Sequence, residues 1–391
     1  MIWLSLRSIR TTGTNKNSLI MNILINTSNL KKGGGLQVAD SICKSLNQFP
    51  QHNFIVVLST FFPKTGEEIE HYTNVKVYTY NVKNNYQTLI FGRDKFLDGL
   101  VERNKVDVAM TVFGPSRWNP RCKHLSGFAL SFLVMPESPY FQRMNWKEKL
   151  KANLRNKLWE VYFRRSAKFF FTENPMISER VEKLFKGSRV FTVTNYYNQV
   201  FDQPEKWVEN PLPKFDGVSL LNISTPYPHK NLNIAIDILN VMAVKHPDLR
   251  LRFVYTIDES DLPQLPVDMK ESFLFIGRVN VDECPSLYQQ CEISFQPTLI
   301  ECFTASYPEA MRMERPIVTT SMAFAQGLCG KAAAYYSPLS AEEAAEAIYK
   351  VASDAEYRNQ LVEAGTEQLK TYDTYDERAK KLIELCEEIG G

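Results

Sequence analysis

Short apolar runs alternate with segments of helical periodicity from residue 21 to the end of the chain. A short apolar run bounded by turn residues predicts a buried strand, and apolar residues that recur every three or four positions predict a helix. The predicted strands are 21–26, 54–58, 75–80, 106–110, 169–171, 190–193, 218–223, 251–255, 273–276, 293–295 and 316–320. The main predicted helices are 36–46, 88–103, 144–168, a helix ending at 244, 287–292, 306–313, 341–352, 356–369 and 375–389. This alternation predicts an α/β protein with doubly wound parallel sheets.

The length of 391 residues is sufficient for two domains with separate cores. We expect a first Rossmann-like domain over 21–202, a linker rich in proline and polar residues over 203–217, and a second Rossmann-like domain over 218–372. Residues 373–391 are predicted to form a terminal helix, and residues 1–20 a disordered extension.

The two halves of the chain carry opposite charge. Residues 1–200 hold 29 Lys and Arg against 14 Asp and Glu, whereas residues 201–391 hold the remaining 17 and 30. The balances are therefore +15 and −13, which sum to the net charge of +2. Either the two domains have different partners, or the asymmetry has no functional meaning; both interpretations stay open.

The cysteines and the apolar runs limit the cellular setting. Seven cysteines are scattered and have no C-x-x-C spacing, which favours neither a zinc site nor a disulfide framework and fits a reducing cytoplasm. No apolar run reaches the eighteen or so residues that would predict a transmembrane helix. The apolar block near the N-terminus is too short to predict a secretory signal. We therefore expect a cytoplasmic protein, with no nucleic-acid partner.

The strongest candidate site follows the strand predicted at 293–295. Glu301 lies in the next loop, and Glu309 lies about one turn inside a helix predicted to start near Thr304 or Ala305. The unpaired N–H groups at a helix start carry partial positive charge and bind phosphate well. Ionised carboxylates accept hydrogen bonds from vicinal hydroxyls. This stretch is therefore suited to a ligand that carries both phosphates and hydroxyls.

Two further loops are expected to face the same site. Gly33, Gly34 and Gly35 lie between the first strand and a helix, where a glycine-rich loop lets phosphates approach, although a flexible turn explains a triple glycine equally well. Lys230 stands just before the first helix of the second domain. Its ammonium would there neutralise a departing diphosphate.

These residues resemble the nucleotide-binding region of retaining glycosyltransferases of family 4, which have the GT-B fold. That family reads P-S-x-x-E-G-F-G, then P-E-A-M on a helix, then P-V or P-I-V. The matching segments here are Pro297 to Thr304 (PTLIECFT), Pro308 to Met311 (PEAM), Pro316 to Val318 (PIV), Lys230 to Leu232 (KNL) and Gly330 to Pro338. The resemblance covers about residues 21–390, and it is strong in the second domain and weak in the first.

The resemblance implies two Rossmann-like domains that face each other across a cleft, with the last helix crossing back to the first domain. It implies a retaining, metal-independent transfer of a sugar from a UDP- or GDP-linked donor to a glycan or lipid-linked acceptor hydroxyl, without a further cofactor. Glu301 and Lys230 are the expected catalytic residues. The expected donor-binding residues are Gly34, Gly35, Lys230, Val279, Glu301, Phe303, Thr304, Ala305 and Glu309, and no metal ligand is expected.

Three family features are replaced in this chain: two glycines after the first glutamate, an arginine in the loop of Lys230, and a His-Asp pair in the first domain. The residues found instead are Cys302 and Thr304, Ser224 and Thr225, and Pro136 and Glu137. The nearest histidine to that pair, His124, is expected to be a structural or loop residue.

Because of these departures, a second interpretation stays open: the chain is a non-catalytic GT-B homologue that acts as a binding or partner subunit. An epimerase on the same fold would need further acid and base residues, which the sequence does not identify. The lack of a G-x-G-x-x-G fingerprint disfavours an NAD-dependent dehydrogenase.

The helix predicted over 144–168 carries an apolar stripe within a basic surround. The stripe consists of Trp146, Leu150, Leu154, Leu158 and Tyr162. One interpretation is peripheral contact with the inner face of an anionic membrane. The other, which we favour from the sequence, is that the stripe packs on its own domain and leaves the basic face in solvent.

Overall fold

In the computed structural model, the apolar runs of the first half form one parallel sheet with the strand order β3-β2-β1-β4-β5-β6-β7. The structure describes residues 20–31, 33–262 and 265–391, so the extension predicted over 1–20 lies outside it except for Ile20. The strands are β1 (Asn22–Asn26), β2 (Asn53–Leu58), β3 (Val75–Thr79), β4 (Val108–Thr111), β5 (Lys123–Gly127), β6 (Phe169–Thr172) and β7 (Arg189–Thr192). The helices of this domain are α1 (Gly34–Lys44), α2 (Pro63–Ile69), α3 (Lys95–Arg103), α4 (Ser131–Val134), α5 (Pro139–Gln142), α6 (Trp146–Ser166) and α7 (Pro175–Leu184).

Strand β1 lies at the centre of this sheet. Ile23 is opposite Phe54 of β2 on one side and Val108 of β4 on the other. Ile23, Leu24 and Ile25 are all buried, as expected for a parallel sheet that is covered on both faces. The carboxyl ends of its strands therefore open on one edge, where ligands bind in such sheets.

The second half of the chain repeats this architecture with a six-stranded parallel sheet in the order β10-β9-β8-β11-β12-β13. The strands are β8 (Val218–Asn222), β9 (Leu251–Tyr255), β10 (Phe273–Phe275), β11 (Ile293–Gln296), β12 (Ile317–Thr320) and β13 (Ala333–Tyr336). The helices are α8 (Ile234–Lys245), α9 (Cys284–Gln290), α10 (Ser306–Arg312), α11 (Ala323–Cys329), α12 (Ala341–Ser353) and α13 (Ala355–Leu369). The two doubly wound sheets confirm the predicted fold class.

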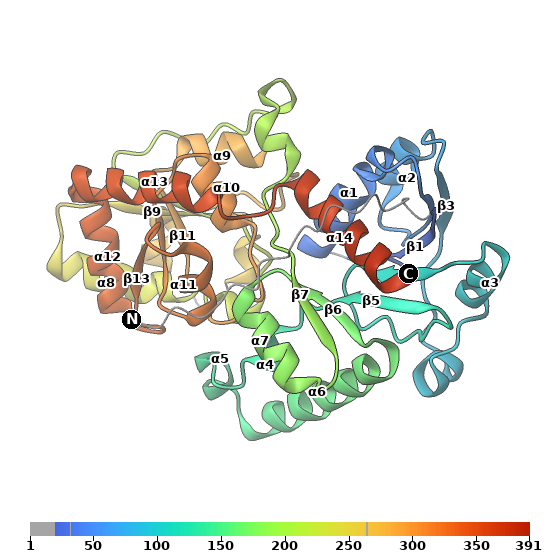
Figure 1. Ribbon diagram of the computed structural model, residues 1–391. Coiled ribbons are helices and arrows are strands. Elements are labelled where there is room, and N and C mark those ends of the chain that lie inside the picture. Colours follow the sequence, from blue (N-terminus) through green and yellow to red (C-terminus); the bar gives the residue numbers. More distant parts are fainter. Residues whose placement is uncertain (1–19, 32, 263–264) are drawn as a thin grey trace, which may run out of the picture.

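The last helix, α14 (Tyr375–Gly390), leaves the second domain and lies against the first (Figure 1). Its side of contact is apolar, because Leu382, Ile383 and Cys386 join the buried cluster that contains Ile23. Thr374 begins the helix with a capping box to Glu377. The last helix, which follows the second domain in sequence, therefore packs on the first domain.

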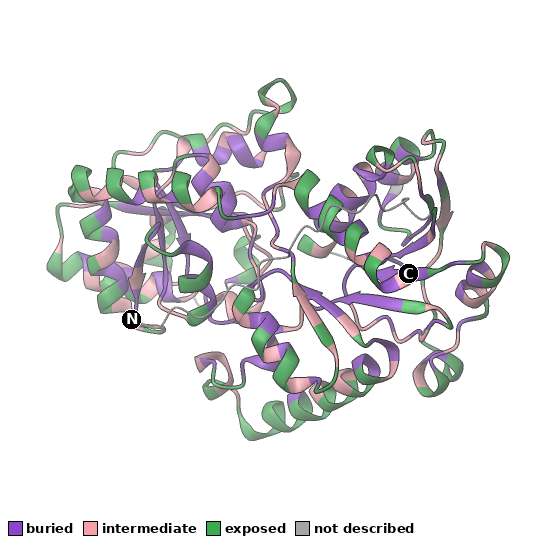
Figure 2. Ribbon diagram, in the orientation of Figure 1, coloured by how far each residue is buried: buried purple, intermediate pink, exposed green. Residues whose placement is uncertain are grey.

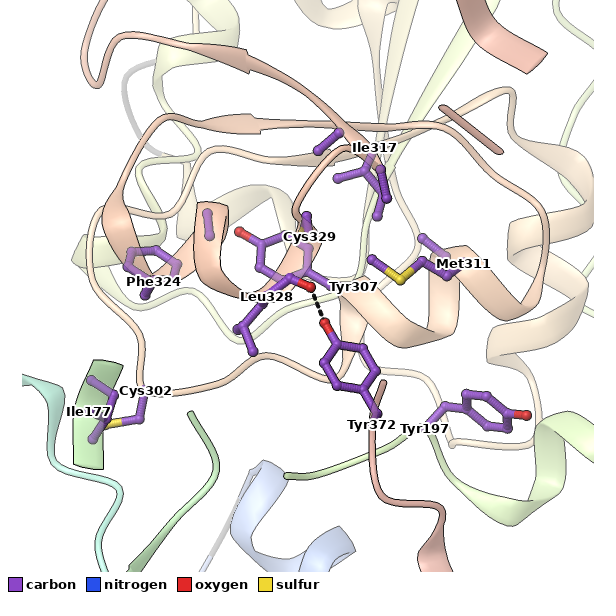
Figure 3. Packing of buried hydrophobic residues seen from close by; sticks show 14 of the residues in the cluster. Ile177, Tyr197, Cys302, Tyr307, Met311, Ile317, Phe324, Leu328, Cys329 and Tyr372 are labelled. Atoms are coloured by element: carbon purple, nitrogen blue, oxygen red, sulfur yellow. Dashed lines mark hydrogen bonds between the residues drawn. The ribbon is translucent and has the colours of Figure 1, made fainter. Parts of the chain in front are cut away.

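A shared apolar cluster joins the two domains. It contains Ile177 of α7 from the first domain and Cys302, Tyr307 and Met311 from the second. Figure 3 shows Cys302 directed towards Ile177, and Tyr372 donating a hydrogen bond to the carbonyl of Leu328. The strands at the centre of both domains are buried, and the outer helices expose their far sides (Figure 2). The two domains are therefore joined by a packed apolar contact.

Several helix boundaries differ from the prediction, and two of them change the first domain. Helix α1 begins at Gly34, two residues earlier than expected, so Gly34 and Gly35 form its first turn and Gly33, with φ of 79°, precedes it. The helix predicted over 88–103 is broken: a π-helical turn (Gln87–Phe91) ends at Gly92, and α3 starts anew after Asp94. The break follows from Gly92, whose φ of 67° cannot continue a helix.

Strand β5 was not predicted, because its sequence KHLSG has no apolar run. It holds His124, which is buried. His124 Nδ1 lies 2.6 Å from the Ser166 carbonyl oxygen, and Nε2 lies 2.8 Å from Thr111 Oγ1. Burial lowers the pKa of His124 to about 4. This confirms the structural role expected for that histidine. Helix α11 and strand β13 were also not predicted.

The favoured interpretation of the 144–168 helix is wrong. Most of the predicted stripe on α6 is exposed, and of its five members only Tyr162 is buried. The helix packs instead through the opposite side, which carries Ala152, Phe163 and Ser166. A helix with apolar residues on two sides can bury only one of them against a single sheet, and periodicity alone does not say which.

Candidate active site

A cleft of about 1010 Å³ lies between the domains. The loops at the carboxyl ends of strands in both sheets form its walls, as expected for ligand crevices in open α/β folds. The predicted site residues that line it are Gly34, Gly35, Lys230, Glu301, Phe303, Thr304, Ala305 and Glu309. Val279 does not line the cleft; it packs against the cluster between the domains, and Val281 lines the cleft instead.

Lys230 and Glu301 form an ion pair in the second-domain wall. Lys230 ends a 3₁₀ turn (Pro228–Lys230) before α8, and its Nζ lies 2.6 Å from Glu301 Oε1. Their side chains are only 13% and 15% exposed. Thr298 Oγ1 donates to the same carboxylate oxygen at 3.2 Å. The ammonium has three N–H donors, so Lys230 can hold Glu301 and still bind a phosphate oxygen.

His229 lies beside this pair. Its Nε2 is 3.7 Å from Glu301 Oε1, and burial lowers its pKa, opposed by the charge of Glu301. The backbone ties its loop to that of Glu301, because the Leu299 N–H donates to the His229 carbonyl at 2.9 Å. The two loops that carry the cation and the carboxylate are therefore joined by a backbone hydrogen bond as well as by the ion pair.

Glu309 lies in the first turn of α10, where the Glu309 N–H bonds the Ala305 carbonyl at 2.9 Å. The side chain is buried at the cleft wall, and its Oε2 accepts a hydrogen bond from the Tyr288 hydroxyl at 3.2 Å. Burial raises the pKa of Glu309 to about 7. A desolvated carboxylate in a cleft favours hydrogen-bond donors such as ligand hydroxyls, which compensate for the lost water.

The two replaced glycines do not distort the loop after Glu301. Neither Cys302 nor Thr304 has a positive φ, so neither position requires glycine. The Cys302 side chain is buried in the cluster with Ile177, away from solvent. Thr304 is buried and lines the cleft. Both side chains are therefore accommodated by packing.

The segment that replaces the His-Asp pair packs on the second domain. Ser138 Oγ donates to the Leu299 carbonyl at 2.8 Å, and Arg143 donates to Asn231 Oδ1. Glu137 pairs with Arg180 of α7. Residues 129–132 line the cleft, whereas residues 133–140 do not, because these later residues are occupied by the contact with the second domain.

A buried polar cluster in the first-domain wall was not predicted. Glu173 follows β6, Asn195 follows β7, Arg378 projects from α14, and all three line the cleft. Arg378 donates to Asn195 Oδ1. Burial raises the pKa of Glu173 to about 7, opposed by the Arg378 charge, and burial lowers the pKa of Arg378 to about 10. Glu173 Oε1 and Arg378 Nε have no partner among the described residues.

Nothing in the sequence pattern of α14 distinguishes Arg378 from an exposed helix residue, so only its place in the fold reveals it. Ser224 and Thr225, which stand where the resembled family has an arginine, also line the cleft. Over the described ranges, no group of three or more His, Cys, Asp or Glu is placed to hold a metal ion. All seven cysteines are free.

Comparison with known proteins finds a family match within the second domain. Residues 218–354 match the family described as glycosyl transferases group 1. No curated protein matches the chain.

Solved structures match over nearly the full length. A glycosyltransferase from Rickettsia africae is 15% identical, with a TM-score of 0.67 over 95% of this chain and 99% of that one. Sucrose-phosphate synthase from Thermosynechococcus elongatus is 12% identical, with a TM-score of 0.68 over 94% and 98%. Anabaena HepE, in complex with UDP and glucose, is 14% identical, with a TM-score of 0.64 over 94% and 99%. The chain therefore has the GT-B fold, and residues 218–354 match the group 1 glycosyltransferase family.

Proposed function

We propose that this protein is a retaining, metal-independent glycosyltransferase that moves a sugar from a UDP- or GDP-linked donor to a hydroxyl of a glycan or lipid-linked glycan. One observation carries the proposal. Lys230, Glu301 and Glu309 meet in the interdomain cleft of a chain whose second domain is a group 1 glycosyltransferase domain.

Each of these residues has a distinct role in the proposal. Glu309 accepts hydrogen bonds from the ribose hydroxyls of the nucleotide, and these bonds replace the water that burial removed. The backbone amides of Phe303 to Ala305, at the start of α10, bind the diphosphate together with the Gly34–Gly35 turn of α1. Glu301 binds hydroxyls of the donor sugar.

In the transfer, the bond between the anomeric carbon and the diphosphate oxygen breaks, and the acceptor oxygen forms the new bond to that carbon. The acceptor proton passes to an oxygen of the leaving diphosphate. Negative charge grows on the diphosphate as it departs, and the Lys230 ammonium stabilises it. Because Lys230 also holds Glu301 at 2.6 Å, the leaving group and the sugar are positioned by linked side chains.

The donor class is supported by two of the structures that this chain resembles. HepE was solved with UDP and glucose, and Staphylococcus aureus TarM with UDP and α-GlcNAc-glycerol. The acceptor class is supported by charge, since the first half of this chain carries a balance of +15. We propose an anionic or lipid-linked acceptor, such as a surface-polysaccharide precursor, used in the cytoplasm at the inner face of the membrane.

Donor turnover tests the proposal. The purified protein is incubated with UDP- and GDP-sugars in EDTA, and released nucleotide and the first-formed sugar anomer are followed by NMR. We expect one donor to be consumed, by hydrolysis or by transfer, with the configuration of the donor retained. Lys245→Ala is the matched control for Lys230→Ala, because Lys245 is a more exposed lysine that pairs with Glu346 outside the cleft.

An inverted product would contradict the retaining mechanism, and a strict need for added metal would contradict metal independence. If a nucleotide-sugar binds but no donor is ever consumed, the chain is a non-catalytic GT-B homologue that acts as a binding or partner subunit.

A further inference from the structure

Helix α6 exposes a row of large apolar side chains that no described element covers. Trp146, Leu150, Leu154, Leu158 and Val161 are 70%, 63%, 71%, 49% and 56% exposed. At about 100° per residue they fall within one third of the helix circumference. The row runs from Trp146 to Val161 of this 21-residue helix, so it extends over about 23 Å. Figure 1 shows α6 along the outer edge of the first domain, and Figure 2 shows its solvent side exposed.

A second segment, distant in sequence, extends this surface. Tyr86, Ile90 and Phe91 are also exposed, in and beside the π-helical turn. Arg165, at the end of α6, donates to the carbonyls of Leu89 and Ile90 at 3.0 and 2.8 Å and fixes the turn beside the helix. The exposed side chains of residues 86–91 therefore lie beside the end of α6, and we call these and the row on α6 together the α6 face.

The charge of the α6 face is basic. Helix α6 holds seven Lys and Arg against two Glu. By helical geometry Lys147 and Lys157 fall within the apolar row and Lys151 falls at its edge, and all three are exposed. Glu148 and Glu160 fall outside the row. Lysines beside leucines can bury their alkyl stems and extend their ammonium groups to anionic headgroups.

We propose that the α6 face binds an anionic lipid bilayer, with α6 lying in the plane of the membrane. Contiguous exposed apolar surface with a basic rim is typical of such interfacial helices, and a tryptophan at the helix end suits the headgroup level. Among the helices that the structure describes, none is long and apolar enough to cross a membrane.

The face is connected to the cleft through α6 itself. Trp159 of α6 lines the cleft, and Asn156 Nδ2 donates to the carbonyl of Phe132, another cleft residue, at 3.1 Å. Docking by α6 would thus hold the first-domain wall of the cleft near the lipid surface. Only this last step, delivery of a lipid-linked acceptor, rests on the proposed function; lipid binding itself does not.

Vesicle sedimentation tests the proposal with the full chain. The vesicles are phosphatidylcholine alone, or phosphatidylcholine mixed with phosphatidylglycerol. We expect binding to the anionic vesicles that weakens with salt, and weak binding to the neutral ones. The pair Leu150→Ser and Leu154→Ser should lower affinity at least about tenfold, because burial of each leucine alone contributes that much. The pair Ile90→Ser and Phe91→Ser should also weaken binding.

The matched control is the pair Val244→Ser and Val267→Ser, which removes two side chains that are each 82% exposed on the second domain. It should bind as the unchanged protein does. Equal binding by the α6-face variants, or no binding to anionic vesicles, would overturn the proposal. A lipid-free dimer that the Leu150 and Leu154 changes dissociate, seen by light scattering, would also overturn it in favour of a second copy. Nucleotide binding, measured separately, reports on the proposed function alone.

Discussion

Lys230 Nζ lies 2.6 Å from Glu301 Oε1, so the cation expected to bind the donor diphosphate is already paired with the carboxylate expected to bind the donor sugar. Both side chains are largely buried. Removal of one partner from such a pair leaves an uncompensated charge, whereas removal of both does not. We therefore propose that the pair links donor binding to the stability of the cleft.

Removal of either Lys230 or Glu301 alone should lower the melting temperature by more than half of the loss that removal of both causes. We expect Lys230→Ala to lower donor kcat/KM by about 10²–10³, the usual effect of losing one group that stabilises transition-state charge. Glu301→Gln should lower it as well. In a double-mutant cycle, the loss of melting temperature in Lys230→Ala with Glu301→Gln should be smaller than the sum of the single losses. Additive losses would contradict the coupling.

Donor affinity should rise with pH because of Glu309. Its pKa is about 7, and only the ionised carboxylate accepts hydrogen bonds with both oxygens. Calorimetric titration with a UDP-sugar, whose diphosphate does not titrate near neutrality, should show stronger binding at pH 8 than at pH 6. The change should approach about tenfold per pH unit below the pKa. Glu309→Gln should flatten this profile and lower affinity at pH 8.

Glu173→Gln is the control for that titration. Glu173 also lines the cleft and also has a raised pKa, but it lies in the first-domain wall. We expect its UDP-sugar profile to keep the rise between pH 6 and 8. If Glu309→Gln keeps the rise and Glu173→Gln loses it, the ribose site is assigned to the wrong carboxylate.

The raised pKa of Glu309 also affects folding. Its folded pKa of about 7 exceeds the ordinary value of 4.5, so the folded state binds the proton more tightly. The resulting stability is fully present below pH 4.5 and is lost as pH rises through about 7. Glu309→Gln removes this dependence, so its melting temperature relative to the unchanged protein should be higher at pH 8 than at pH 5. The opposite order in differential scanning calorimetry would contradict the assigned burial.

Cys302 should stabilise the contact between the domains rather than obstruct the donor. Cys302→Gly removes a side chain from the cluster with Ile177 and adds backbone freedom, so it should lower the unfolding free energy by about 1–3 kcal/mol in urea. Cys302→Ala should lower it less. Tighter donor binding by Cys302→Gly at unchanged stability would show that Cys302 narrows the site.

Periodicity predicted most of the strands because buried parallel strands such as β1 and β2 are apolar along their whole length. It failed at β5, where Lys123 is exposed at the start of the strand and the buried His124 is accommodated by hydrogen bonds to Thr111 and Ser166. It could not choose the packed side of α6, since both sides carry apolar residues.

The candidate site was predicted unevenly for a similar reason. Lys230, Glu301 and Glu309 stand next to turns and helix starts, which can be recognised from local sequence patterns. Arg378 belongs to a helix that enters the cleft wall only after the chain has crossed between the domains. Glu173 and Asn195 follow ordinary strands, and only the fold shows that the three meet. Such long-range proximity has no local signal.

The central claim is that this cleft binds a nucleotide-sugar through Glu309 and Lys230. It is tested most directly by the melting temperature of the protein in the presence of UDP, GDP, ADP and their sugar conjugates, with and without magnesium. A ligand that binds only the folded state raises the melting temperature as its concentration exceeds its Kd. We predict a rise with one nucleotide and its conjugates that does not need magnesium and that Glu309→Ala abolishes. No rise with any of these ligands, or an equal rise in Glu309→Ala, would contradict the claim.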